Sequence, residues 1–136
     1  MAVIAVTAAG CALPSSVEQF VPASRAVDGI YSFGVDMSDS LAVYDLAFFT
    51  RVDRPGAQRS LIRPAIRLDL EWVSPGGEKS GETVYMPSGD EKGVLQSYRR
   101  GVRPSEAGVW TLNAKVVQPE DGFRGLGIIC KRNGTR

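Results

Sequence analysis

The chain has 136 residues, with 16 basic and 15 acidic side chains and a formal net charge of +1. This length suits one domain. The near balance of acidic and basic residues argues against a surface built to bind nucleic acid or an anionic membrane, since such binding needs clustered positive charge. There is no histidine and there are only two cysteines, Cys11 and Cys130, which excludes a structural zinc site of the usual kind. We therefore expect no metal and no cofactor, and no segment has the ~20 apolar residues of a membrane-spanning helix.

The N-terminal segment, residues 2–10, consists of small or apolar residues and ends at Cys11. The stretch Ala8-Ala9-Gly10-Cys11 resembles the lipobox at the end of a bacterial lipoprotein signal, whose cysteine becomes lipidated. The alternative is an ordinary first strand, but a strand without polar alternation must be buried on both faces, and a first strand rarely is. We predict that residues 1–10 are a truncated signal remnant and that lipid on Cys11 anchors the protein, at about 0.8 kcal/mol per buried methylene.

A lipidated Cys11 cannot also pair with Cys130. The second cysteine lies in the apolar segment 126–132, so we expect a lone, buried thiol that packs as a small hydrophobe. A disulfide between the two cysteines is the competing possibility. Residues 11–28 contain Pro14 and Pro22 with several serines and no clean periodicity, which predicts a tether between the lipid and a folded domain that spans residues 29–136.

From Ile30 the pattern changes to a period of two, which is typical of strands. Residues 30–37 place Tyr31, Phe33, Val35 and Met37 on one face, and the turn-forming segment 36–40 leads into a second apolar strand over 41–52. The polar composition of residues 53–64 predicts a loop with its bend at Pro55-Gly56.

The clearest strand covers residues 65–73, where apolar side chains alternate strictly with Arg67, Asp69 and Glu71. The turn at Pro75-Gly76 predicts a return strand over 81–87, and further strands follow over 94–104, 109–117 and 126–132. No window shows a helical period. Seven or eight short strands with turns between them predict an all-β, single-domain antiparallel β-sandwich of the jelly-roll or immunoglobulin-like kind.

Three segments, residues 31–52, 106–116 and 122–134, resemble the gliding motility-associated lipoproteins of Bacteroidetes (the GldH family) and small envelope lipoproteins related to them. The shared features are an Asp-containing turn before a strand that ends in Arg, here Asp39 to Arg51, and a late glycine-rich strand that ends in basic residues. The resemblance implies a lipid-anchored, all-β envelope protein and carries over no catalytic residue. Related lipoproteins sent to the cell surface tend to have an acidic cluster just after the cysteine. Only Glu18 follows Cys11 closely, so we expect a periplasm-facing protein on the outer or inner membrane.

Four aromatic residues, Trp72, Tyr85, Tyr98 and Trp110, raise the possibility of a sugar-stacking platform. Both tryptophans share a face with aliphatic neighbours two residues away, so core packing is the better interpretation for them. Tyr85 and Tyr98 are therefore the candidates for a ligand site.

The acidic residues flank two turns, and they suggest a calcium site or a glycosidase pair. The spacing of a calcium loop is absent, and Asp is an ordinary turn former, so we expect neither. These acids are Asp36, Asp39 and Asp45 at one turn, and Glu82, Asp90 and Glu91 at the other.

We therefore expect a non-enzymatic, lipid-anchored protein of the bacterial cell envelope that acts through contacts with an envelope protein partner, with gliding or envelope machinery as the implied setting. The alternative is a carbohydrate- or ligand-binding β-sandwich module at the envelope. A hydrolase with a carboxylate pair is a weaker third hypothesis.

Overall fold

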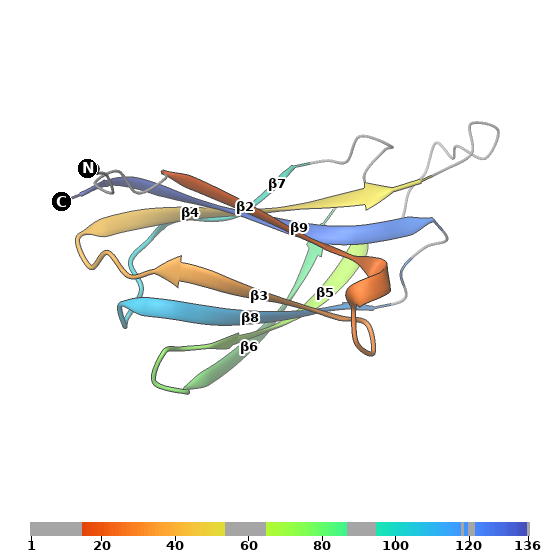
Figure 1. The fold of residues 1–136 in the computed structure, drawn as a ribbon, viewed down its shortest axis with the longest axis horizontal. Coiled ribbons are helices and arrows are strands. Elements are labelled where there is room, and N and C mark those ends of the chain that lie inside the picture. Colours follow the sequence, from red (N-terminus) through yellow and green to blue (C-terminus); the bar gives the residue numbers. More distant parts are fainter. Residues whose placement is uncertain (1–14, 54–64, 87–94, 118, 120–121, 136) are drawn as a thin grey trace, which may run out of the picture.

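Two four-stranded antiparallel sheets pack face to face in the computed structural model, which describes residues 15–53, 65–86, 95–117, 119 and 122–135 (Figure 1). The predicted all-β sandwich is confirmed, with eight strands in the described residues. One sheet has the order β2 (Ser16–Pro22), β9 (Phe123–Thr135), β4 (Ala42–Val52) and β7 (Gln96–Val102). The other has the order β3 (Ile30–Met37), β8 (Gly108–Val117), β5 (Ile66–Val73) and β6 (Lys79–Met86).

The predicted tether is wrong for most of its length. Residues 16–22 form the edge strand β2, which pairs antiparallel with β9 from Ser16 opposite Lys131 to Pro22 opposite Gly125. A short 3-10 helix, η1 (Ala23–Arg25), then leads to β3. The sequence pattern did not predict this strand, because an edge strand has only one partner strand and a short half-buried face. Such a strand does not require clean alternation, and it tolerates Pro22 at its end. The described part of the fold therefore begins before Gly29.

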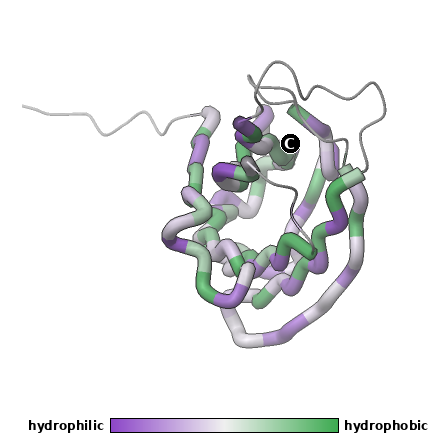
Figure 2. Tube along the Cα trace, turned by 90° about the vertical axis from the view of Figure 1, so that its right-hand side faces the viewer, coloured by the Kyte–Doolittle hydropathy of each residue, from purple (hydrophilic) through white to green (hydrophobic). Residues whose placement is uncertain are grey.

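The core fills the space between the sheets with the side chains that the period of two predicted. Tyr31, Phe33, Val35 and Met37 of β3 are all buried, and β5 and β8 bury their alternate aliphatic residues in the same way. Figure 2 shows this alternation of hydrophobic and hydrophilic residues along the strands. Among the described residues, no helix is long and apolar enough to cross a membrane.

Cys130 lies in this core on β9, as a free and buried thiol, which confirms its predicted role as a small hydrophobe. Burial, with a smaller contribution from the nearby Asp36 carboxylate, raises the pKa of the thiol to about 11. Because the thiolate is the nucleophilic form, this cysteine is poorly suited to react at neutral pH.

The outer face of the first sheet carries two phenylalanine rings that cover glycines of β9. Phe20 and Phe49 lie in the same row on either side of Gly127, with ring centroids 6.0 Å apart and planes within 19° of parallel. A Cβ atom on Gly127 would stand only 2.1 Å from the Phe49 ring, so this close approach requires glycine. Arg51 lies over the Phe20 ring at 5.3 Å.

Thr50 is the one fully buried side chain whose hydroxyl has no hydrogen-bond partner within the described ranges. An unsatisfied buried hydroxyl costs free energy, and valine has the same shape without that cost. We expect Thr50→Val to raise the free energy of unfolding by about 1 kcal/mol in urea titrations. Thr50→Ser, which keeps the hydroxyl and loses the methyl, should lower it. A destabilised Thr50→Val variant would show that the hydroxyl is satisfied.

The two open sides of the sandwich are closed differently. At the β2–β3 side, Gln19 Nε2 donates a hydrogen bond of 2.7 Å to the Gly34 carbonyl and joins the sheets. At the other side, the edge strands β6 and β7 are joined by aromatic and charged side chains that surround a cavity. This second side positions the candidate site.

Candidate ligand-binding site

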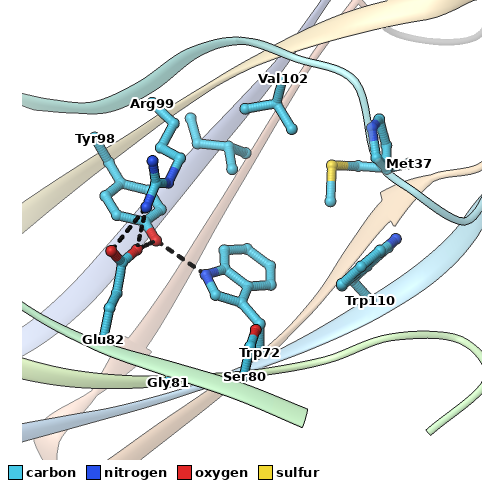
Figure 3. A pocket seen from close by; sticks show the side chains of 11 residues that line it. Met37, Trp72, Ser80, Gly81, Glu82, Tyr98, Arg99, Val102 and Trp110 are labelled. Atoms are coloured by element: carbon cyan, nitrogen blue, oxygen red, sulfur yellow. Dashed lines mark hydrogen bonds and ion pairs between the residues drawn. The ribbon is translucent and has the colours of Figure 1, made fainter. Parts of the chain in front are cut away.

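A cavity of about 330 Å³ lies between the two sheets at the edges of β6 and β7 (Figure 3). Its walls are mostly apolar and its polar groups gather at one end, which is the usual make-up of a small-molecule site. The apolar walls come from Met37, Leu46, Trp72, Val102, Pro104 and Trp110, and the remaining lining from Ser80, Gly81, Glu82, Tyr98 and Arg99.

Both tryptophans of the chain line this one cavity. Their ring centroids lie 6.3 Å apart and their planes meet at 76°, so the indoles form two walls at nearly a right angle. Trp110 Nε1 donates to the Glu106 carbonyl at 2.9 Å, and Trp72 Nε1 donates to the Tyr98 hydroxyl at 3.0 Å. Each indole N–H is therefore satisfied by the protein, which fixes the orientation of both rings.

Tyr98 extends the surface of Trp72. The two rings are within 10° of parallel, with centroids 6.4 Å apart. The planes of rings stacked face to face are about 3.5 Å apart, so atoms of the two rings could not approach more closely than that. Trp72 Nε1 and the Tyr98 hydroxyl oxygen are only 3.0 Å apart. The rings therefore lie beside one another rather than face to face, and the hydrogen bond holds Tyr98 at the edge of the indole.

The polar end of the cavity is a connected network (Figure 3). The Tyr98 hydroxyl donates to Glu82 Oε2, and Arg99 Nη2 donates to both Glu82 oxygens at 2.7 and 2.8 Å. The Arg99 guanidinium also lies 5.1 Å from the centre of the Tyr98 ring. The chain of contacts from Trp72 through Tyr98 and Glu82 to Arg99 links β5, β6 and β7 and holds the polar groups in place.

This network shifts the protonation of its members. Burial works against the charged form of Glu82, but the hydrogen bonds from Tyr98 and Arg99 outweigh it and lower the pKa of the carboxyl. Burial, followed by the hydrogen bond to Glu82, raises the pKa of Tyr98. Interactions with Tyr98 and Glu82 raise the pKa of Arg99. At neutral pH the site holds a carboxylate, a neutral phenol and a guanidinium, so its net charge is close to zero.

A β-bulge directs Tyr98 and Arg99 to the same side of β7. Leu46 pairs with Arg99 while its neighbour Ala47 pairs with Ser97, so Tyr98 is an extra residue in the ladder. Strict alternation would place consecutive side chains on opposite faces, and an inserted residue removes that constraint. Both side chains consequently reach the cavity, which the period-two pattern of the sequence did not predict.

A second register shift follows at Gly101, and Asp45 holds it. Gly101 has φ +65°, a left-handed conformation that suits glycine. Its N–H donates to Asp45 Oδ1 at 2.8 Å, and Asn133 Nδ2 donates to Asp45 Oδ2 at 2.7 Å. The backbone hydrogen bond from Gly101, and then the one from Asn133, lower the pKa of Asp45 below its ordinary value of 3.8.

We expect Asp45→Ala to lower the free energy of unfolding by about 1–2 kcal/mol at neutral pH, because Gly101 and Asn133 lose their acceptor. A lowered pKa in the folded state means that this contribution is complete above the unfolded value and is lost as the pH falls below about 3.8. The gap between wild type and Asp45→Ala should therefore narrow between about pH 5 and pH 2 in urea titrations. Asp45→Asn keeps an acceptor that does not titrate, so its stability relative to Asp45→Ala should not change over this pH range. A difference between wild type and Asp45→Ala that stays constant with pH would contradict the assignment.

Of the two tyrosines predicted as ligand candidates, only one lies in the cavity. Tyr98 lies in the cavity, whereas Tyr85 lies on the outer face of β6 with 63% of its surface exposed. Trp72 and Trp110 face inward as predicted, but they are half-buried and line the cavity instead of filling the core. The predicted lipidation site, Cys11, lies outside the described residues.

The sequence analysis considered Glu82 only as a turn acid of a calcium or glycosidase site, and it assigned neither Glu82 nor Arg99 to the candidate ligand site that the structure shows. The signal for Glu82 was present, since β6 places it in phase with Val84 and Met86, and a carboxylate on an apolar face is unusual. The side of the strand on which Arg99 lies could not be predicted from alternation, because it depends on the bulge.

Two of the remaining acids of the predicted turns, Asp36 and Asp39, have local partners. Asp36 and Asp39 line a smaller cavity of about 150 Å³ at the β2–β3 side. Asp36 accepts hydrogen bonds from the backbone and hydroxyl of Ser38, and Asp39 lies 3.6 Å from Arg132. Asp90 and Glu91 lie outside the described residues. Across the described ranges, no group of three or more His, Cys, Asp or Glu side chains could hold a metal ion.

A scan of the chain against protein-family models finds no match. A search of curated proteins likewise finds no match. The resemblance to gliding motility-associated lipoproteins stays a prediction, and function is inferred from the geometry of the site.

Proposed function

We propose that this protein is a binding module that takes a small, ring-shaped ligand into the cavity between β6 and β7. The observation that supports it best is the convergence of both tryptophans and Tyr98 on one cavity whose polar end is held rigid by the Glu82–Arg99 pair. Pre-positioned side chains lose little entropy when a ligand binds, so such a site favours binding. This supports the ligand-binding alternative over a function carried by protein contacts alone.

An enzymatic function has less support. Hydrolysis by a carboxylate pair needs two acids that face each other, and Glu82 is the only acid among the described residues that line the cavity. Its carboxylate already accepts hydrogen bonds from two side chains, which keeps it ionised and unsuited to general acid catalysis near neutral pH.

The experiment uses the two indole N–H signals in proton–nitrogen NMR spectra, because the chain has two tryptophans and both line the cavity. The probes are cyclohexanol and the methyl glycosides of glucose, galactose and mannose. A ligand in the cavity should shift both indole signals saturably. Tyr85→Ala is the matched control, since it removes an exposed tyrosine outside the cavity and should leave the shifts unchanged, whereas Tyr98→Ala should reduce them. If no probe moves either signal in the wild-type protein, the proposal is wrong.

We also propose that lipid on Cys11 holds this domain at the bacterial envelope, facing the periplasm. The support is the lipobox-like stretch at residues 8–11. The test is metabolic labelling of the full chain with a fatty-acid probe. The label should be lost in Cys11→Ala. It should be kept in Cys130→Ala, because Cys130 of the wild-type protein is buried in the core. Equal labelling of Cys11→Ala and wild type would overturn this proposal without affecting the binding site.

A further inference from the structure

We infer that the ligand of this cavity is a neutral sugar residue, a pyranose ring bound through its C–H face and its hydroxyl groups. This inference rests on the proposed binding function and specifies its ligand class. Three properties of the cavity support it: its charge, the way its rings are held, and the hydrogen-bonding capacity of its polar end.

The charge of the cavity favours a neutral ligand. Glu82 and Arg99 form a two-point ion pair, with Arg99 Nη2 at 2.7 and 2.8 Å from the two carboxylate oxygens. An anionic ligand near Arg99 would also meet Glu82, and a cationic ligand near Glu82 would also meet Arg99. Each charge of this partly exposed pair is already compensated by its partner, so an ionic ligand gains little, whereas a neutral hydroxyl can bond to either partner without separating them.

The rings of the cavity offer their faces rather than their polar edges. Both indole N–H groups and the Tyr98 hydroxyl already bond within the protein. What they present to a ligand is the ring of Trp72 with the Trp110 ring nearly perpendicular to it, whereas the Arg99 guanidinium lies over the Tyr98 ring. Such a surface contacts a flat apolar face, and a pyranose has one where its axial C–H groups lie together.

The polar end requires a ligand with several hydroxyl groups. Arg99 has five N–H donors; Nη2 donates to both Glu82 oxygens and the guanidinium also interacts with Tyr98, so at least two donors remain for a ligand. The Glu82 carboxylate has about four acceptor sites and already accepts from Tyr98 and Arg99. A ring without hydroxyls would displace water from these groups and leave them unpaired, which is costly.

The size of the cavity suits a single ring. Its volume of about 330 Å³ corresponds to roughly ten water molecules at ~30 Å³ each. One sugar ring with its first hydration waters fits this space. For so small a neutral ligand we expect a dissociation constant on the order of 1 mM.

The test compares the methyl glycosides of glucose, galactose and mannose with cyclohexanol, which keeps the ring size and has one hydroxyl. Binding to the wild-type protein is measured from the two indole N–H signals and from tryptophan emission. We expect at least one glycoside to bind about tenfold more tightly than cyclohexanol. If cyclohexanol binds at least as tightly as every glycoside, the sugar assignment is wrong and the binding function stands. If none of the probes binds, the binding function itself is wrong.

A charge-neutral double variant, Glu82→Gln with Arg99→Gln, tests the role of the polar end. It keeps polar, uncharged side chains at both positions and removes the charge-assisted hydrogen bonds, so glycoside affinity should fall about tenfold while cyclohexanol affinity stays the same. The retained pair of indole signals reports that the variant is folded. The single variant Arg99→Lys, which keeps the charge and loses the planar fork, should weaken glycoside binding less. Glycoside binding that is unchanged in the double variant would overturn the inference.

Discussion

Replacing Phe48 with alanine is expected to cost about 3–5 kcal/mol of folding free energy, a large part of the 5–15 kcal/mol that typically stabilises a domain. Phe48 is 1% exposed and lies in the core on the inner face of β4. Its ring also lies 5.1 Å from the Tyr98 ring, tilted by 49°, so it supports the wall of the binding cavity from behind. The loss combines the transfer free energy of the ring with the cavity that it leaves.

The adjacent residue supplies the control for this prediction. Phe49 has the same side chain, but it lies on the outer face over Gly127 and is half-buried. Phe49→Ala should cost about 1–2 kcal/mol, because less area is removed from water and no internal cavity is created. Urea unfolding followed by circular dichroism measures both variants. Equal losses would contradict the assignment of the two residues to opposite faces of β4.

Trp72→Ala is expected to reduce ligand binding more than tenfold and to destabilise the domain by about 2–4 kcal/mol. The indole of Trp72 forms one wall of the cavity, contacts both Trp110 and Tyr98, and donates the hydrogen bond that orients the Tyr98 hydroxyl. Its removal therefore takes away the stacking surface and one connection of the polar network.

A conservative variant separates these two contributions. Trp72→Phe keeps an aromatic face and loses the N–H, so it should bind more weakly than wild type but more tightly than Trp72→Ala. Trp110 remains as the spectroscopic reporter in both variants. Binding is measured as the saturable shift of its indole signal with the methyl glycosides. Wild-type affinity in Trp72→Ala would exclude the cavity as the binding site.

Much of the fold followed from local patterns along the chain. The strict alternation in β3 and β5 predicted both the strands and the side chains they bury, such as Phe33 and Leu68. A strand with one wet face must alternate, so the pattern is visible in a single segment. Edge strand β2 was missed because its few buried side chains and its terminal Pro22 left no such signal.

The sequence by itself determined the all-β class, the approximate strands and the inward phase of Trp72 and Trp110, because these properties depend on neighbours two residues apart. Only the tertiary structure decided that Tyr98 belongs to the candidate site and Tyr85 does not. That distinction rests on the bulge that adds Tyr98 to the β4–β7 ladder and on the approach of β7 to β6, which brings Arg99 to Glu82. A bulge is a relation between two strands, and a contact across the sandwich joins residues 17 positions apart, so neither is visible in the alternation of one segment.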